Sequence, residues 1–126
     1  MGLAVRGKTF AKLFENAAQG MVSLLYDPKK ISTSKSAPIA VRAESWESLL
    51  VCWLNEVLFR IAVKGLRFKR FKVTGLQPFK LKAQGFGKKS GRKEKNLARE
   101  IKAATYYNLK IKKEKSGYFV RIVLDI

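Results

Sequence analysis

The apolar residues between Ser45 and Gly65 repeat at helical spacing. They recur at i, i+3, i+4 and i+7 over about four turns, which is typical of a helix with a buried face. Ser45 is suited to cap the start of this helix, and Gly65 is suited to the left-handed position after its end. Val51, Cys52 and Phe59 widen the apolar surface, so we expect neighbours on more than one side of the helix.

A second helix is predicted earlier in the chain. Thr9 is a suitable cap, and an apolar stripe then runs from Phe10 to Leu25, until Asp27 and Pro28 end the pattern. Elsewhere apolar residues alternate with polar ones, as they do in half-buried strands. This alternation predicts strands in six segments: residues 1–6, 39–43, 66–73, 79–86, 101–111 and 120–126.

The order of these elements predicts an α+β fold. We expect two amphipathic helices packed on one face of a mostly antiparallel β-sheet, in a single two-layer domain that covers residues 1–126. In the strand predicted over residues 66–73, the apolar residues before and after Lys69 and Arg70 alternate in different phases, and a bulge there would reconcile them. Residues 85–96, GFGKKSGRKEKN, are predicted to form a glycine-rich basic loop, but they lack the spacing of a phosphate-binding loop.

The chain is strongly basic, and its positive charge is unevenly distributed along the sequence. The formal net charge is +18, and residues 64–115 hold eighteen basic and three acidic residues, a local charge of +15. Such a density attracts polyanions such as RNA, although a solvated basic surface without a partner would look the same in the sequence. The residues that we expect to contact RNA lie in the predicted basic loop: Lys88, Lys89, Arg92 and Lys93.

Several classes of function are disfavoured by what the chain lacks. It has no histidine and one cysteine, Cys52, which excludes Ser-His and Cys-His triads, histidine metal ligands and an intrachain disulfide. No nucleophile, base and orienting group can be assembled, so we expect no enzymatic activity. The sequence shows neither a signal peptide nor an apolar run near the ~18 residues of a membrane span, and we expect a cytoplasmic protein.

Three residues in the C-terminal part of the chain are candidates for chemistry. The carboxylate of Asp125 and the terminal carboxylate of Ile126 could converge on a hard cation such as Ca²⁺, Mg²⁺ or Mn²⁺. Alternatively, Asp125 is an exposed residue that pairs with Arg121, two positions away on the same face of the strand. Lys102 lies in the run KAATYYNLK, and the pattern fits a solvated lysine as well as a functional one.

Four segments of the chain together resemble a known family. They read GKTFAKLFENAAQGMVSLLYDP, ESLLVCWLNEVLF, EIKAATYYNLKI and RIVLDI. These segments resemble blocks of the archease family, in the family's order and at its spacing, and they span nearly the whole chain. The resemblance implies a small α+β protein that assists an RtcB-type RNA ligase. The implied role is to promote the ligase's GTP-dependent guanylylation and its multiple turnover in tRNA splicing or RNA repair, without joining RNA itself.

The resemblance also implies a site for a divalent cation (Ca²⁺, Mg²⁺ or Mn²⁺). In the family it is built from an Asp of an N-terminal H-x-A-D-x-G block, the penultimate Asp and the chain end. The last two of these correspond here to Asp125 and Ile126. The family's functional lysine corresponds to Lys102. This chain begins at the Gly of the N-terminal block, so the first ligand is absent from it. It is also strongly basic, whereas archeases are often acidic, which keeps a general RNA-binding or chaperone-like protein as the alternative.

Overall fold

The computed structural model describes residues 1–90 and 97–126. Its helices are α1 (Phe10–Leu25), a short 3-10 helix (Pro28–Lys30) and α2 (Trp46–Ala62). Its strands are β1 (Gly2–Gly7), β2 (Lys35–Arg42), β3 (Leu66–Gln77), β4 (Lys80–Lys89), β5 (Ala103–Thr105), β6 (Lys112–Glu114) and β7 (Gly117–Asp125). The α+β class and the antiparallel pairing predicted from the sequence are confirmed.

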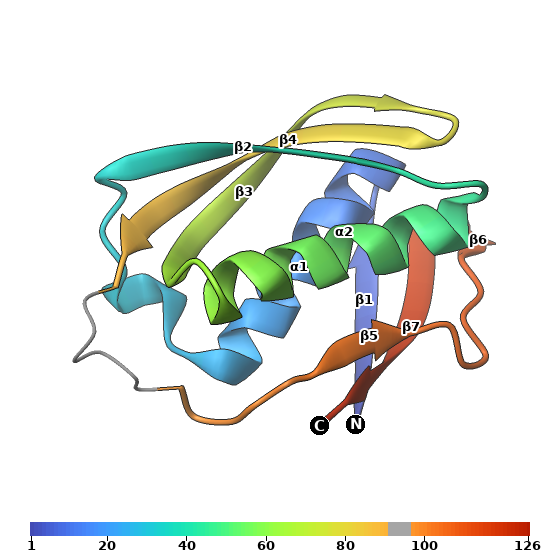
Figure 1. Ribbon diagram of the computed structural model, residues 1–126. Coiled ribbons are helices and arrows are strands. Elements are labelled where there is room, and N and C mark those ends of the chain that lie inside the picture. Colours follow the sequence, from blue (N-terminus) through green and yellow to red (C-terminus); the bar gives the residue numbers. More distant parts are fainter. Residues whose placement is uncertain (91–96) are drawn as a thin grey trace.

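The described strands form two sheets rather than the single sheet that we expected. One has the order β1-β7-β5, with β6 also paired to β7, and the other has the order β2-β4-β3. Figure 1 shows the two long helices between these sheets, so the two-layer prediction is wrong. Helix α1 contacts β1 and β3, whereas α2 contacts β2 and β5. Each helix buries apolar residues on more than one side, and a second sheet covers what one sheet would leave exposed.

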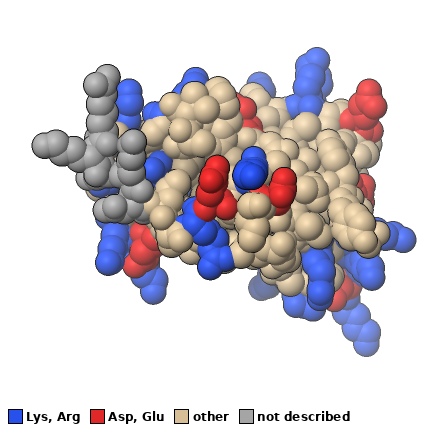
Figure 2. All heavy atoms as spheres, turned by 60° about the horizontal axis from the view of Figure 1, so that its bottom comes forward, with Lys and Arg blue, Asp and Glu red and all other residues tan. Residues whose placement is uncertain are grey.

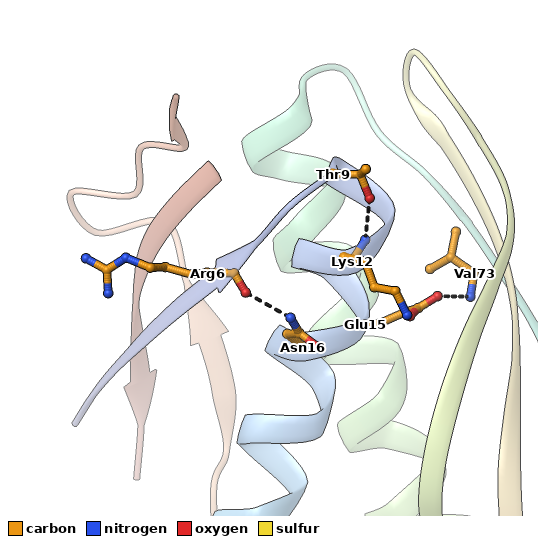
Figure 3. A network of polar contacts seen from close by, with 6 residues as sticks. All are labelled: Arg6, Thr9, Lys12, Glu15, Asn16 and Val73. Carbon is orange, nitrogen blue, oxygen red and sulfur yellow. Dashed lines mark hydrogen bonds and ion pairs between the residues drawn. The ribbon is translucent and has the colours of Figure 1, made fainter. Parts of the chain in front are cut away.

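The motif ENAA in α1 is explained by its contacts (Figure 3). The carboxylate of Glu15, which is buried, accepts hydrogen bonds from the Val73 N–H of β3 at 2.8 Å and from Lys12 Nζ at 3.2 Å. Asn16 Nδ2 donates to the Arg6 carbonyl of β1 at 2.8 Å. The two alanines that follow are fully buried. The motif therefore ties α1 to one strand of each sheet.

Both predicted helix caps are confirmed. Thr9 Oγ1 accepts a hydrogen bond from the Lys12 N–H at 3.1 Å, and Ser45 forms a reciprocal capping box with Ser48. Gly65 takes the left-handed conformation expected after α2, with φ +70°. The bulge predicted near Lys69 is also present, since the β3–β4 register shifts between Phe68 and Arg70.

The C-terminal half of the chain differs from the prediction at two places. The segment predicted as a basic loop from residue 85 continues as strand β4 as far as Lys89. The long strand predicted over residues 101–111 is reduced to β5, and Tyr106 begins a turn that closes with a Leu109 N–H to Tyr106 carbonyl bond of 3.0 Å. Composition was misleading at the first place because Gly85 and Gly87 lie in a paired strand, and alternation was misleading at the second because β5 pairs with β7 over only three residues.

Candidate functional site

The candidate site is built on β5, the short strand that Lys102 immediately precedes. Strand β5 pairs with β7 on one side, and on the other it is held by a side chain of α2. The Ala104 N–H donates to Asn55 Oδ1 at 2.8 Å, and Asn55 Nδ2 donates to the Ala104 carbonyl at 3.3 Å. Asn55 thus makes the two hydrogen bonds that a neighbouring strand would make, and it fixes β5 against α2.

Lys102 and Asp125 lie next to each other across β5 and β7. The Lys102 N–H donates to the Asp125 carbonyl at 2.7 Å, and the register places Ala103 opposite Asp125. Both residues are exposed. No ion pair of either side chain is found among the described residues, so the predicted pairing of Asp125 with Arg121 is not observed. The main chains of the two residues therefore adjoin, and each exposed side chain carries a charge that has no ion-pair partner among the described residues.

Both ends of the chain adjoin this site. The Leu124 N–H donates to the Met1 carbonyl at 2.7 Å, and the Met1 ammonium group donates to the Leu124 carbonyl at 3.2 Å. Figure 1 shows the two ends side by side at the bottom of the view. Figure 2, which brings that side forward, shows acidic and basic side chains close together. Lys102 and Asp125, which are both exposed, give the site charges of both signs.

Lys102 precedes β5 instead of lying within the strand predicted over residues 101–111. Ile101 and Ala104 are buried, and Ala103 and Thr105 are half-buried. The strand begins at Ala103, so the period-2 alternation does not extend back to Ile101. Lys102 is exposed because it precedes the strand, which alternation alone could not predict.

A cation at this site would have few ligands. The described residues contain no group of three or more His, Cys, Asp or Glu side chains that could hold a metal ion. Asp125 and the terminal carboxylate of Ile126 supply two carboxylates, whereas Ca²⁺ takes six to eight oxygen ligands. The side chains of the described residues alone do not complete the coordination of a divalent ion. Metal binding by Asp125 and Ile126 stays a prediction.

The residues predicted to contact RNA lie elsewhere. Lys88 is half-buried and Lys89 is exposed, and both are at the end of β4, in the sheet that does not contain Asp125. Arg92 and Lys93 lie outside the described residues. The structure therefore separates Lys88 and Lys89 from Lys102 and Asp125 into different sheets.

Asn55 is a positioning residue that was not predicted from the sequence. It lies within the otherwise apolar run of α2, and a half-buried amide in such a run requires partners for its donor and acceptor. That requirement was the available signal. Only the fold shows that the partner is the main chain of Ala104, which lies opposite Leu124, the residue before Asp125.

Comparison with known proteins identifies the family. The model of the Archease protein family (MTH1598/TM1083) matches residues 1–126. Protein archease of Methanosarcina barkeri is 37% identical over 124 residues, which cover 95% of this chain and 85% of the relative. Protein archease of Pyrococcus furiosus is 30% identical over 130 residues, which cover 100% and 92%. The chain belongs to the archease family.

Solved structures agree with this assignment. Protein 1598 of Methanobacterium thermoautotrophicum has a TM-score of 0.81 at 25% identity, with 99% of this chain and 91% of that chain covered. An archease of Thermotoga maritima, described as a possible chaperone, has a TM-score of 0.71 at 21% identity, with 100% and 90% covered, and it supports the fold alone. These names state no catalytic activity.

Neither long helix in the described part of the chain has the length and apolar composition needed to cross a membrane.

The hydrogen bonds of Asn55 lead to the first prediction. We expect Asn55→Ala to lower the free energy of unfolding by about 1–3 kcal/mol, because the main-chain groups of Ala104 lose their partners. We also expect faster amide exchange in β5. The matched control is Gln19→Ala, which removes a 2.9 Å bond from α1 to the Lys69 carbonyl of β3. It should cost some stability and leave β5 exchange unchanged. Equal exchange in both variants would contradict the positioning role.

Proposed function

We propose that this protein is a non-catalytic activator of an RtcB-type RNA ligase. It would promote the ligase's GTP-dependent guanylylation and its multiple turnover in tRNA splicing or RNA repair. Membership of the archease family supports the proposal, and so does one structural observation. Lys102 and Asp125 are joined by a main-chain hydrogen bond of 2.7 Å on an open surface, with both charged groups unpaired among the described residues.

The chemistry of the partner reaction gives each charge a use. Guanylylation transfers GMP from GTP to the ligase and releases pyrophosphate, and phosphoryl transfer of this kind is accelerated by cations placed beside the phosphate oxygens. The ammonium group of Lys102 would supply such a cation from outside the ligase. The carboxylate of Asp125 would pair with a cationic group on the ligase surface and fix the position of the lysine. Neither step requires archease to make or break a bond.

Ligase activation by single variants tests the proposal. We expect Lys102→Ala and Asp125→Ala each to lower the stimulated rate of guanylylation by about tenfold or more, because one well-placed cation contributes at least that much to phosphoryl transfer and Asp125 would fix the position of that cation. Both side chains are exposed, so their removal should change stability by no more than ~0.5 kcal/mol. The assay measures guanylylation and multiple-turnover RNA joining by the cognate ligase, together with thermal melts.

Exposed charges remote from β5 provide matched controls. Lys113→Ala changes a lysine of β6, and Glu44→Ala changes an exposed carboxylate before α2. Both controls should stimulate the ligase fully. Full stimulation by Lys102→Ala and Asp125→Ala would contradict the proposal, and equal losses in all four variants would assign the effect to net charge.

A general RNA-binding or chaperone-like role is the second candidate. The observation that favours it is the net charge of +18, which predicts salt-sensitive binding of RNA without any ligase. One experiment distinguishes the two proposed functions. An activator raises the rate of purified ligase on a short RNA at physiological salt, whereas a general RNA-binding protein changes only the amount of RNA bound.

A further inference from the structure

The outer face of the β2-β4-β3 sheet carries a continuous set of cations. Buried residues of these strands face the helices, and the residues that alternate with them face away. The cross-strand register places Arg70 opposite Phe86, Lys72 opposite Gln84, and Lys80 opposite Arg42. We call this surface the basic sheet face and define it by Phe86 and five exposed cations: Arg42, Arg70, Lys72, Lys80 and Lys82.

No carboxylate balances these charges within the sheet. Strands β2, β3 and β4, all of whose residues are described, contain neither Asp nor Glu. None of the five cations forms an ion pair with another described residue. Figure 1 shows this sheet at the top of the molecule with no described element above it. Like charges on adjacent strands destabilise a sheet, so this arrangement is unfavourable for the isolated protein.

The spacing of the cations is regular. Residues two apart in a strand lie ~6.6 Å apart, and neighbouring strands lie ~4.8 Å apart. Lys80 and Lys82 are two apart in β4, as are Arg70 and Lys72 in β3. A regular array of donors of one sign matches a polymer with regularly repeated negative groups. A typical protein partner instead meets an apolar centre with charges of both signs around it.

An aromatic ring lies within this array. Phe86 is half-buried, and the guanidinium carbon of Arg70 is 4.0 Å from the centroid of its ring. Flat aromatic and guanidinium groups on an open sheet are the surfaces on which unpaired bases stack. Duplex RNA offers no free base faces for such a surface. The ring therefore favours a single strand over a duplex.

We propose that the basic sheet face binds single-stranded RNA, with phosphates on the lysines and arginines and a base on Phe86 and Arg70. This goes beyond ligase activation and does not depend on it. The face lies at the top of Figure 1, and the chain ends beside Lys102 and Asp125 lie at the bottom. The protein could therefore hold an RNA strand on one side while the other side meets a ligase.

Binding of a labelled single-stranded RNA, without ligase, tests the charged part of the proposal. We expect the variant with Arg70→Gln, Lys72→Gln and Lys82→Gln to bind at least about tenfold more weakly at 0.1 M salt. The slope of log K against log salt should fall by about 2, because roughly 0.7 counterions are released per phosphate contact on a single strand. The readout is fluorescence anisotropy over a range of salt concentrations, with melting curves to confirm folding.

The matched control removes the same charge from another place. Lys110→Gln, Lys112→Gln and Lys113→Gln alter three exposed lysines in and beside β6, outside the basic sheet face. This variant should lose no more than about twofold in affinity. Equal losses in the two triple variants would overturn the proposal, because binding would then follow net charge rather than this surface.

Phe86 tests recognition of the base. We expect Phe86→Leu, which keeps an apolar side chain but removes the ring, to weaken binding at least about fivefold and to leave the salt slope unchanged. A polyglutamate of equal charge should bind more weakly than the RNA and should not respond to Phe86→Leu. If the polyglutamate bound as tightly as the RNA, the face would be a docking site for an acidic protein, and if Phe86→Leu bound RNA normally, no base would stack on the ring. Either result would overturn the proposal.

Discussion

Replacing Trp53 with alanine should lower the free energy of unfolding by about 3–5 kcal/mol, as large-to-small changes of buried aromatic residues do. Trp53 is fully buried on α2. Its ring packs edge-on against Phe71 of β3, with centroids 5.5 Å apart, and its Nε1 donates to the Phe14 carbonyl of α1 at 2.9 Å. One side chain thus joins both long helices to the β2-β4-β3 sheet. Because a domain of this size is stable by 5–15 kcal/mol, the loss is a large part of the total.

Two further variants separate the ring from its hydrogen bond. Trp53→Phe keeps most of the apolar volume and should cost about 1–2 kcal/mol, because it removes the donor and leaves a small void. Trp46→Ala is the matched control, since Trp46 is half-buried and contacts Phe10 and Phe79. It should cost less than Trp53→Ala. Urea unfolding followed by circular dichroism measures all three, and a larger loss for Trp46→Ala would show that the core is centred elsewhere.

The helices could be predicted from the sequence because their signals are local. In each helix, the cap (Thr9 or Ser45) lies within one or two turns of the first apolar residues of the stripe. These signals therefore do not depend on the rest of the fold. The predicted face of α2 is the buried one, with Trp53 at its centre. The widened apolar surface of α2 also pointed to neighbours on more than one side.

The division into two sheets could not be predicted in this way. Alternation shows that one face of a strand is buried, and it does not show which strand is the neighbour. Strand β1 pairs with β7 from the other end of the chain, through contacts such as Leu3 opposite Ile122. Such pairings are set by the packing of both helices. The single-sheet prediction failed because it had no information about them.

The candidate site was predictable in its residues and unpredictable in its geometry. Lys102 and Asp125 were named because they match positions in a family, and the structure brings them together through the β5–β7 pairing. Their separation of more than twenty residues gave no sign of the 2.7 Å bond between Lys102 N–H and the Asp125 carbonyl. The basic sheet face was missed for a similar reason, since its cations come from three strands and alternate with buried residues.

Glycine residues were the least reliable sequence signal for where a strand ends. Gly85 and Gly87 were assigned to a loop, but they belong to β4 and face inward where another chain segment comes close. A Cβ atom on Gly85 would lie 2.5 Å from the ring of Phe68, which is fully buried. A Cβ atom on Gly87 would overlap the main-chain carbonyl group of Arg67 on β3. Glycine in a strand marks a close approach as often as a break.

Gly87→Ala should therefore be among the most destabilising single changes in the protein. We expect a loss of about 3 kcal/mol or more and a fall in melting temperature of roughly 10–15 °C, because two backbones must separate to admit one methyl group. The overlap is with main-chain atoms, which cannot rotate away as a side chain could. Thermal and urea unfolding measure the effect.

Gly75→Ala is the matched control for this change. Gly75 also lies in the β3–β4 pair, but a Cβ atom there would meet Lys82 Cβ at 3.7 Å, an ordinary contact, so this variant should stay within about 0.5 kcal/mol of the parent protein. If both glycine variants were equally unstable, the cause would be the general cost of altering a strand glycine. If Gly87→Ala melted normally, β3 and β4 would not be held together as closely as their register requires.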